Sequence, residues 1–125
     1  PSARVLLVEH NRINQMVASR MLLRFGIRCE IVENGKLALD RVHRAQFDLI
    51  FMDCQMPEMD GFEASERIRQ WEGEVSAQVT PIVALTANAM EGAAQRCLDA
   101  GMSDYLTKPI EADRLAESLD RWLAN

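Results

Sequence analysis

The sequence predicts an α/β fold in which a parallel, doubly wound β-sheet is covered by helices on both faces. Short apolar runs alternate along the chain with segments whose apolar residues recur at helical spacing. Uninterrupted apolar strands are typical of a sheet buried on both faces. A crossover helix returns the chain to the same edge of the sheet, so consecutive strands run parallel. Five such strand and helix pairs predict a (βα)₅ chain.

The strands are predicted where the apolar runs lie. Their ranges are Val5–Val8, Arg28–Val32, Asp48–Asp53, Pro81–Thr86 and Ser103–Leu106.

The helices are predicted from apolar residues that repeat every three or four positions. These positions are Ile13, Met16, Val17 and Met21 in the first helix, Ala38, Val42 and Ala45 in the second, Ala64, Ile68 and Trp71 in the third, Met90, Ala93, Ala94, Cys97 and Leu98 in the fourth, and Ala112, Leu115, Ala116, Leu119, Trp122 and Leu123 in the fifth. Gly26 and Gly101 stand where helices commonly end. The polar segment from Gly73 to Thr80 is predicted to be a mobile connection.

Composition excludes several classes of protein. The chain has 125 residues, a net charge of −5 and a pI near 5.0, which argues against binding to nucleic acid or to an anionic membrane. Its apolar runs are far shorter than the ~20 residues of a membrane span. Three widely spaced cysteines without a CxxC pair predict reduced thiols and a cytoplasmic location. The length of 125 residues predicts one domain, residues 1–125. Because the chain begins at Pro1 without a methionine, we expect this domain to be cut from a longer protein.

Polar residues follow the carboxyl ends of four predicted strands, where open parallel sheets form their functional crevice. Glu9 and His10 follow the first strand, Asp53 ends the third, Thr86 ends the fourth, and Lys108 follows the fifth. Each has an ordinary explanation alone, such as a solvated carboxylate at Glu9 or a helix cap at Thr86. Together, however, they predict one cleft that holds an acid, a hydroxyl and a cation.

This combination suits phosphoryl transfer onto Asp53, which would form an aspartyl phosphate. Lys108 and Thr86 would contact the phosphoryl oxygens, and Glu9 would help to hold a divalent metal. Nucleotide binding is disfavoured, since neither GxGxxG nor GxxxxGK[ST] occurs. Phosphatase turnover is also disfavoured because residue 55, a position suited to a general acid, is Gln55.

Four segments resemble the receiver domain of two-component response regulators. They are the runs Val5–Asn11, Asp53–Gly61, Thr86–Ala87 and Tyr105–Pro109. The resemblance covers essentially the whole chain and implies the flavodoxin-like strand order 2-1-3-4-5.

The resemblance also implies residue roles. Asp53 would be the phosphoacceptor, Lys108 the lysine that binds the phosphoryl group, Thr86 the switch hydroxyl and Tyr105 the switch aromatic. Lys108–Pro109 would be a cis peptide. Phosphorylation would change the surface of the fourth helix, fifth strand and fifth helix. The isolated domain would not be an enzyme, apart from slow loss of its own phosphoryl group.

A subtype is indicated by the runs Asn11–Gln15, Asp53–Pro57 and Thr86–Met90, which resemble receivers fused to hybrid sensor histidine kinases. The resemblance implies a hybrid histidine kinase as the parent chain, with this domain in the cytoplasm and any membrane anchor elsewhere in that chain. The implied partners are a histidine kinase core and a histidine phosphotransfer domain. Neither nucleic acid nor membrane would contact this domain.

The sequence departs from the family at His10, where receivers carry a second acidic residue that binds metal directly. The implied magnesium ligands are then Glu9, Asp53 and the backbone carbonyl of Gln55, with His10 unassigned. Because Mg²⁺ prefers oxygen ligands, we expect weakened affinity. Three further interpretations stay open. In the first, His10 recruits Mn²⁺, Zn²⁺ or a similar ion. In the second, His10 is a solvated side chain near the cleft. In the third, the domain is a degenerate receiver that binds partners without phosphorylation.

Overall fold

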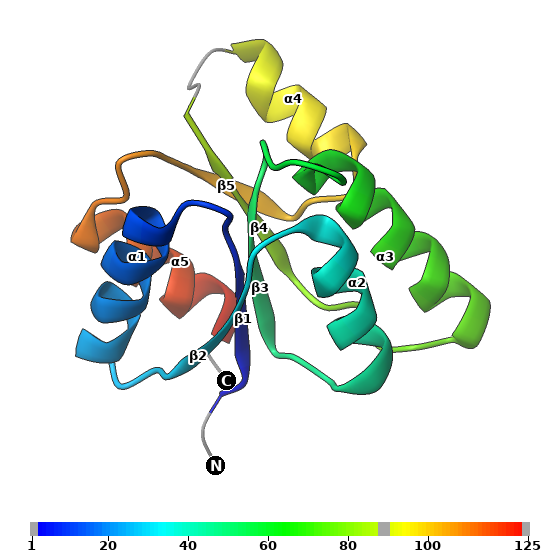
Figure 1. Ribbon diagram of the computed structural model, residues 1–125, viewed down its shortest axis with the longest axis horizontal. Coiled ribbons are helices and arrows are strands. Elements are labelled where there is room, and N and C mark those ends of the chain that lie inside the picture. Colours follow the sequence, from blue (N-terminus) through cyan, green and yellow to red (C-terminus); the bar gives the residue numbers. More distant parts are fainter. Residues whose placement is uncertain (1–2, 88–90, 124–125) are drawn as a thin grey trace.

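The computed structural model describes residues 3–87 and 91–123, and it confirms the predicted (βα)₅ chain (Figure 1). The elements are β1 (Val5–Val8), α1 (Arg12–Arg24), β2 (Cys29–Val32), α2 (Gly35–Arg44), β3 (Leu49–Asp53), α3 (Gly61–Val75), β4 (Ile82–Thr86), α4 (Glu91–Asp99), β5 (Asp104–Thr107) and α5 (Ala112–Leu123). Four strands begin one residue later than predicted, and β5 ends one residue later, at Thr107.

The five strands form one parallel sheet in the order β2-β1-β3-β4-β5, as the resemblance implied. Every residue of the three central strands is buried, whereas the edge strands β2 and β5 are partly exposed. This burial explains the uninterrupted apolar runs of β1, β3 and β4. Because all strands are parallel, their carboxyl ends share one edge, which lies at the top of Figure 1.

Helices cover both faces of the sheet, with α1 and α5 on one face and α2, α3 and α4 on the other (Figure 1). Alternate residues of each strand point to opposite faces. Leu6 and Val8 of β1 therefore enter the core beneath α2 and α3, while Val5 and Leu7 enter the core beneath α1 and α5. Two separate apolar cores hold the sheet between the helix layers.

Local signals set several helix ends. Asn11, Asn34 and Asp60 cap the amino ends of α1, α2 and α3, and each side chain accepts a backbone N–H. Gly26 and Gly101 follow α1 and α4 with φ of 80° and 94°, which confirms their predicted place at helix ends. Among the described helices, none is both long and apolar enough to cross a membrane.

The prediction for the inward face of α1 is wrong at three of its four positions, whereas Met21 is partly buried and packs against the core as predicted. Ile13 is 71% exposed, and Met16 and Val17 are each 47% exposed. The buried positions are Ala18 and Leu22, which pack against the core shared with α5. The periodicity failed here because α1 carries apolar residues on two sides, and spacing alone does not tell which side meets the sheet.

The connection predicted from Gly73 to Thr80 is shorter and better fixed than expected. Gly73 lies within α3, which continues to Val75 and is capped by Ser76 in the left-handed conformation. The buried carboxylate of Glu72 accepts the backbone N–H of Thr80 at 2.9 Å. This hydrogen bond ties the connection to the helix.

Two smaller predictions about helix faces also need correction. Leu98 of α4 is 52% exposed and Ala112 of α5 is exposed, so neither contributes to the core. In α4 the inward position is taken by Cys97, and Leu98 lies about 100° further round the helix. Ala112 is the first residue of α5, before the buried positions of that helix begin at Leu115. Met90, assigned to the same stripe as Leu98, lies outside the described residues.

Candidate functional site

Three charged side chains meet where β1, β3 and β5 end. The ammonium Nζ of Lys108 lies 2.9 Å from Oε1 of Glu9 and 3.1 Å from Oδ1 of Asp53. Glu9 is 1% exposed and Asp53 is 3% exposed, so the lysine compensates two buried carboxylates. The convergence predicted from the strand ends is therefore present for these three residues.

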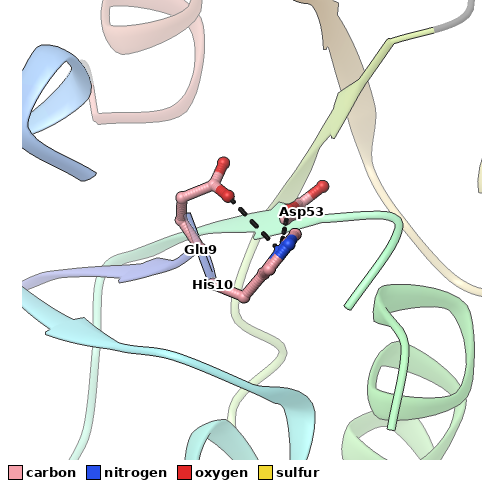
Figure 2. A group of neighbouring side chains, drawn as sticks. All are labelled: Glu9, His10 and Asp53. Atoms are coloured by element: carbon pink, nitrogen blue, oxygen red, sulfur yellow. Dashed lines mark hydrogen bonds and ion pairs between the residues drawn. The ribbon is translucent and has the colours of Figure 1, made fainter. Parts of the chain in front are cut away.

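His10 contacts the other oxygen of each of the same two carboxylates (Figure 2). Its Nδ1 lies 3.3 Å from Oδ2 of Asp53 and 3.7 Å from Oε2 of Glu9. The imidazole is 45% exposed. His10 therefore contacts Glu9 and Asp53 directly while part of its ring is open to solvent. We call Glu9, His10 and Asp53 the acidic cluster.

The orientation of Glu9 is fixed by its neighbours. Its backbone N–H donates to Val32 of β2 at 3.0 Å, which extends the sheet beyond β1. Oε2 accepts the N–H of Asn11, and the Glu9 carbonyl accepts Nε2 of Gln15 at 2.6 Å. The sequence marked Gln15, one turn into α1, only as the end of the subtype run Asn11–Gln15, and its contact with Glu9 was not predicted.

A close approach of the backbone lies directly behind Asp53. A Cβ on Gly61 would fall on the carbonyl oxygen of Asp53, so the start of α3 requires glycine there. The N–H of Gly61 donates to Cys54 at 3.1 Å, and that of Gln55 donates to Oδ1 of Asp53 at 3.2 Å. These contacts hold the carboxylate at the rim of the sheet.

Lys108 is held by its backbone as well as by its ion pairs. The Lys108–Pro109 peptide is cis, as the resemblance implied, and the N–H of Lys108 donates to the carbonyl of Thr86 at 2.8 Å. Burial alone would lower the pKa of Lys108, but its hydrogen bond to Glu9 and the charge of Asp53 outweigh burial and raise that pKa. The ammonium is therefore firmly protonated.

The two predicted switch residues lie on neighbouring strands. Thr86 is 7% exposed at the end of β4, beside β3 and β5. Tyr105 lies on β5, is 38% exposed, and lines a surface groove with Glu111 and Arg114 of the α5 region. The structure thus places Thr86 at the rim of the charged cluster and Tyr105 on an outer surface.

A pair of buried thiols lies next to the cluster. Sγ of Cys54 is 3.9 Å from Sγ of Cys97 on α4, and both cysteines are free. Burial, followed by the neighbouring Cys97, raises the pKa of Cys54 to about 12. Cys54 is thus a small side chain buried in the core. Its contact with Cys97 has no local sequence signal.

The side chains present fit a divalent cation. One ligand atom from each of Glu9, His10 and Asp53 lies within 4.8 Å of the other two. Two of these residues offer carboxylate oxygens, the donors that Mg²⁺ and Mn²⁺ accept, and the third offers an imidazole nitrogen.

Comparison with known proteins identifies the family to which this geometry belongs. The sequence profile of the response regulator receiver domain matches residues 5–120. The sensor histidine kinase GacS of Pseudomonas protegens is 44% identical over 119 residues, which are 95% of this chain and 13% of GacS. The hybrid signal transduction histidine kinase B of Dictyostelium discoideum is 41% identical over 129 aligned positions, 96% of this chain and 7% of that kinase. The chain thus spans a small part of these relatives.

Two solved structures are close in fold and sequence. The receiver domain of the sensor histidine kinase PA1611 from Pseudomonas aeruginosa, solved with magnesium coordinated in its active-site cleft, has a TM-score of 0.87, 41% identity and full coverage of both chains. The receiver domain of Saccharomyces cerevisiae Ssk1, solved with the histidine phosphotransfer protein Ypd1, has a TM-score of 0.91 and 34% identity over 98% of this chain and 89% of that chain. By sequence, strand order and the acidic cluster at its sheet edge, this chain belongs to the response regulator receiver domains of two-component signal transduction.

Proposed function

We propose that Asp53 accepts a phosphoryl group from a phosphohistidine in a two-component phosphorelay. One observation carries the proposal: the buried Asp53 carboxylate stands at the carboxyl edge of the sheet, 3.1 Å from the Lys108 ammonium. A carboxylate oxygen would form the new P–O bond as the P–N bond to the donor histidine breaks. The donor ring, already protonated at its other nitrogen, keeps the electron pair of the broken P–N bond and leaves as neutral imidazole.

The surrounding side chains would stabilise the added charge. Lys108 would move its hydrogen bond from Asp53 to a phosphoryl oxygen, and Thr86 would donate its hydroxyl to another. A divalent ion, Mg²⁺ or Mn²⁺, would neutralise the phosphoryl oxygens when bound. Glu9, Asp53 and the backbone carbonyl of Gln55 would hold that ion, with reduced Mg²⁺ affinity because His10 replaces a carboxylate.

The signal would leave the domain through the α4–β5–α5 surface. Thr86 ends β4, and Tyr105 lies on β5, the next strand of the sheet. Movement of Thr86 toward the phosphoryl group would open space into which Tyr105 turns inward. Amide chemical shifts of α4, β5 and α5 are expected to change on phosphorylation and to stay fixed in Asp53→Asn.

A histidine phosphotransfer domain and a histidine kinase core are the partners we propose. The exposed apolar face of α1, formed by Ile13, Met16 and Val17, begins three residues after His10 and borders the acceptor site. A phosphohistidine on a partner helix would reach Asp53 if that partner covered this face. Ile13→Ser is expected to slow transfer from a phosphotransfer domain without changing phosphorylation by acetyl phosphate. Leu98→Ser, an exposed leucine on α4, is the matched control.

The parent protein is proposed to be a hybrid histidine kinase with this domain in the cytoplasm and any membrane anchor elsewhere in the chain. The kinase relatives are much longer than the 125 residues here, which leaves room for a catalytic core. The isolated domain, residues 1–125, would act as a stoichiometric acceptor that loses its phosphoryl group slowly, with no nucleic acid or membrane contact.

Intact-protein mass spectrometry tests the acceptor role. Incubation with acetyl phosphate and a divalent metal is expected to add one phosphoryl group to the wild-type chain and none to Asp53→Asn. Incorporation at another residue, or none with any metal, contradicts the proposal.

The second candidate function is a receiver that binds its partner without phosphorylation. His10 favours it, because the cluster has two carboxylates where the family has three. Under this alternative Asp53→Asn leaves relay output and partner affinity intact in the full-length parent. Under the acceptor proposal the same substitution abolishes relay.

A further inference from the structure

The two buried carboxylates of the acidic cluster divide their oxygens between two opposite neighbours. Oε1 of Glu9 and Oδ1 of Asp53 contact Lys108, at 2.9 and 3.1 Å. Oε2 of Glu9 and Oδ2 of Asp53 face Nδ1 of His10, at 3.7 and 3.3 Å. The cluster therefore has a lysine side and an imidazole side. On the lysine side a cation already lies between the carboxylates.

The imidazole side has the spacing of a metal site. Ligand atoms bound at ~2.0–2.2 Å to one metal ion lie roughly 3.0–3.5 Å from one another. The 3.3 Å between Nδ1 of His10 and Oδ2 of Asp53 falls in this range, and the 3.7 Å to Glu9 needs only a small closure. Figure 2 shows the His10 ring directed at both carboxylates, and one ligand atom from each of the three residues lies within 4.8 Å of the others, so that an ion would have to draw them only slightly closer.

The chemistry of this donor set differs from that of an all-oxygen site. Neutral imidazole is a weak ligand for Mg²⁺, which prefers oxygen atoms in octahedral geometry, but a good ligand for first-row transition metals. We infer that His10 Nδ1 coordinates the metal directly, together with Glu9 and Asp53, and that this receiver selects a divalent transition-metal ion over Mg²⁺. The inference rests on the proposed function only in placing the ion at the acceptor site.

The three side chains of the cluster differ in exposure in a way that would let an ion enter from solvent. Glu9 and Asp53 are buried and fixed by backbone contacts, whereas the His10 side chain is 45% exposed. Two protein ligands are thus preorganised, while the third is free to close on an ion that enters from solvent. Water, and later a phosphoryl oxygen, would fill the remaining coordination positions from the exposed side of His10.

Calorimetric titration of the purified chain without a phosphodonor tests this inference. Mg²⁺, Mn²⁺ and Co²⁺ are added to the wild type, His10→Asp, His10→Gln and His43→Gln. The chain has two histidines, and His43 stacks on Trp71 far from the cluster in sequence, which makes it the matched control. The informative quantity is how the affinity ratio of Co²⁺ to Mg²⁺ depends on His10, because most sites favour Co²⁺ to some extent.

We expect His10→Gln to lower Co²⁺ affinity about tenfold or more, with little change for Mg²⁺. His10→Asp should raise Mg²⁺ affinity about tenfold and so lower the ratio as well. His43→Gln should leave all three affinities unchanged. Nitrogen NMR of the imidazole on titration with diamagnetic Zn²⁺ should show the large shift at Nδ1 of His10. Equal ratios in the wild type and His10→Gln would overturn the inference.

The two proposals fail separately. If Asp53 gains a phosphoryl group with Mg²⁺ while the metal ratio does not depend on His10, the acceptor role stands and the metal inference falls. If His10 sets the ratio but no metal supports phosphorylation, the metal inference stands and the acceptor role falls. Circular dichroism of the His10 variants confirms that each is folded before titration.

Discussion

Nζ of Lys108 lies closer to Glu9 than to Asp53, at 2.9 against 3.1 Å. Glu9 therefore anchors the lysine independently of Asp53. If Asp53 accepts a phosphoryl group as proposed, the ion pair with Glu9 would persist and keep Lys108 at the rim of the sheet. We therefore expect the lysine to matter for stability as well as for the proposed phosphorylation.

Lys108→Met is expected to lower the free energy of unfolding at pH 7 by about 1–3 kcal/mol, since it leaves two buried carboxylates without a cation. The pKa of Lys108 is raised by folding, so its contribution is complete below the ordinary value of 10.5 and is lost as pH rises through the higher folded value. The stability difference between wild type and variant should therefore shrink only above pH 10.5. Urea denaturation of both proteins at a series of alkaline pH values measures this difference in the free energy of unfolding. Lys36→Met, at an exposed lysine of α2, should show no such change.

Gly61→Ala is expected to destabilise the fold by about 1–3 kcal/mol, because its Cβ would overlap the carbonyl oxygen of Asp53. Displacement of the acceptor should also slow phosphorylation. Gly73→Ala, in the same helix but with open space around its Cβ position, should instead stabilise by about 0.5–1 kcal/mol. Thermal and urea unfolding compare the two variants. Equal effects at both positions would show that the close approach at Asp53 is unimportant.

Arg69→Met is expected to lower the free energy of unfolding by about 3 kcal/mol, which is near the lower end of the range measured when one partner of a buried ion pair is removed. Arg69 donates to Glu72 at 2.8 Å, to the carbonyl of Thr80 at 2.9 Å and to that of Gly101 at 2.8 Å, and Glu72 is 3% exposed. Arg67→Met removes an exposed pair with Glu63 and should change stability by about 0.5 kcal/mol or less. A similar loss in both variants would contradict the assigned role of Arg69.

The three cysteines should differ sharply in alkylation. Burial raises the pKa of Cys54 to about 12, so almost none of this thiol is ionised at pH 8. Cys29 is partly exposed, whereas Cys54 and Cys97 are buried. Iodoacetamide followed by peptide mapping should label Cys29 first, and all three should react alike in urea. Rapid labelling of Cys54 in the folded protein would contradict this burial.

The strands and the charged cluster could be predicted because their signals are local. Fully buried strands such as β3 are apolar throughout, and a parallel sheet brings Glu9, Asp53 and Lys108 to one edge wherever the intervening helices lie. The inward face of α1 could not be predicted in this way. Ile13 and Leu22 are equally apolar, and only the packing of α1 against the sheet decides that Leu22 is buried.

Contacts between distant segments were also beyond sequence reasoning. Nothing near Cys54 indicates that its thiol meets Cys97, which is 43 residues away. The same holds for Glu72, whose place in a charged run suggests a solvated face. Its burial depends on Arg69 and on the backbone of Thr80, which meet only in the folded chain.

The contact between Cys54 and Cys97 has a mechanical consequence for α4. Among the side chains described for that helix, Cys97 is the one that is buried, and it rests against the residue that follows Asp53. The Arg96 guanidinium adds a contact 4.0 Å over the ring of Phe62, and most of the other described side chains of α4 are exposed. Because little apolar surface is exposed when such a helix moves, we expect its tilt to cost little free energy. A differential free energy of about 1.4 kcal/mol at the strand end would then shift the populations of its positions tenfold, so that a modification of Asp53 would reach α4 through the neighbouring Cys54.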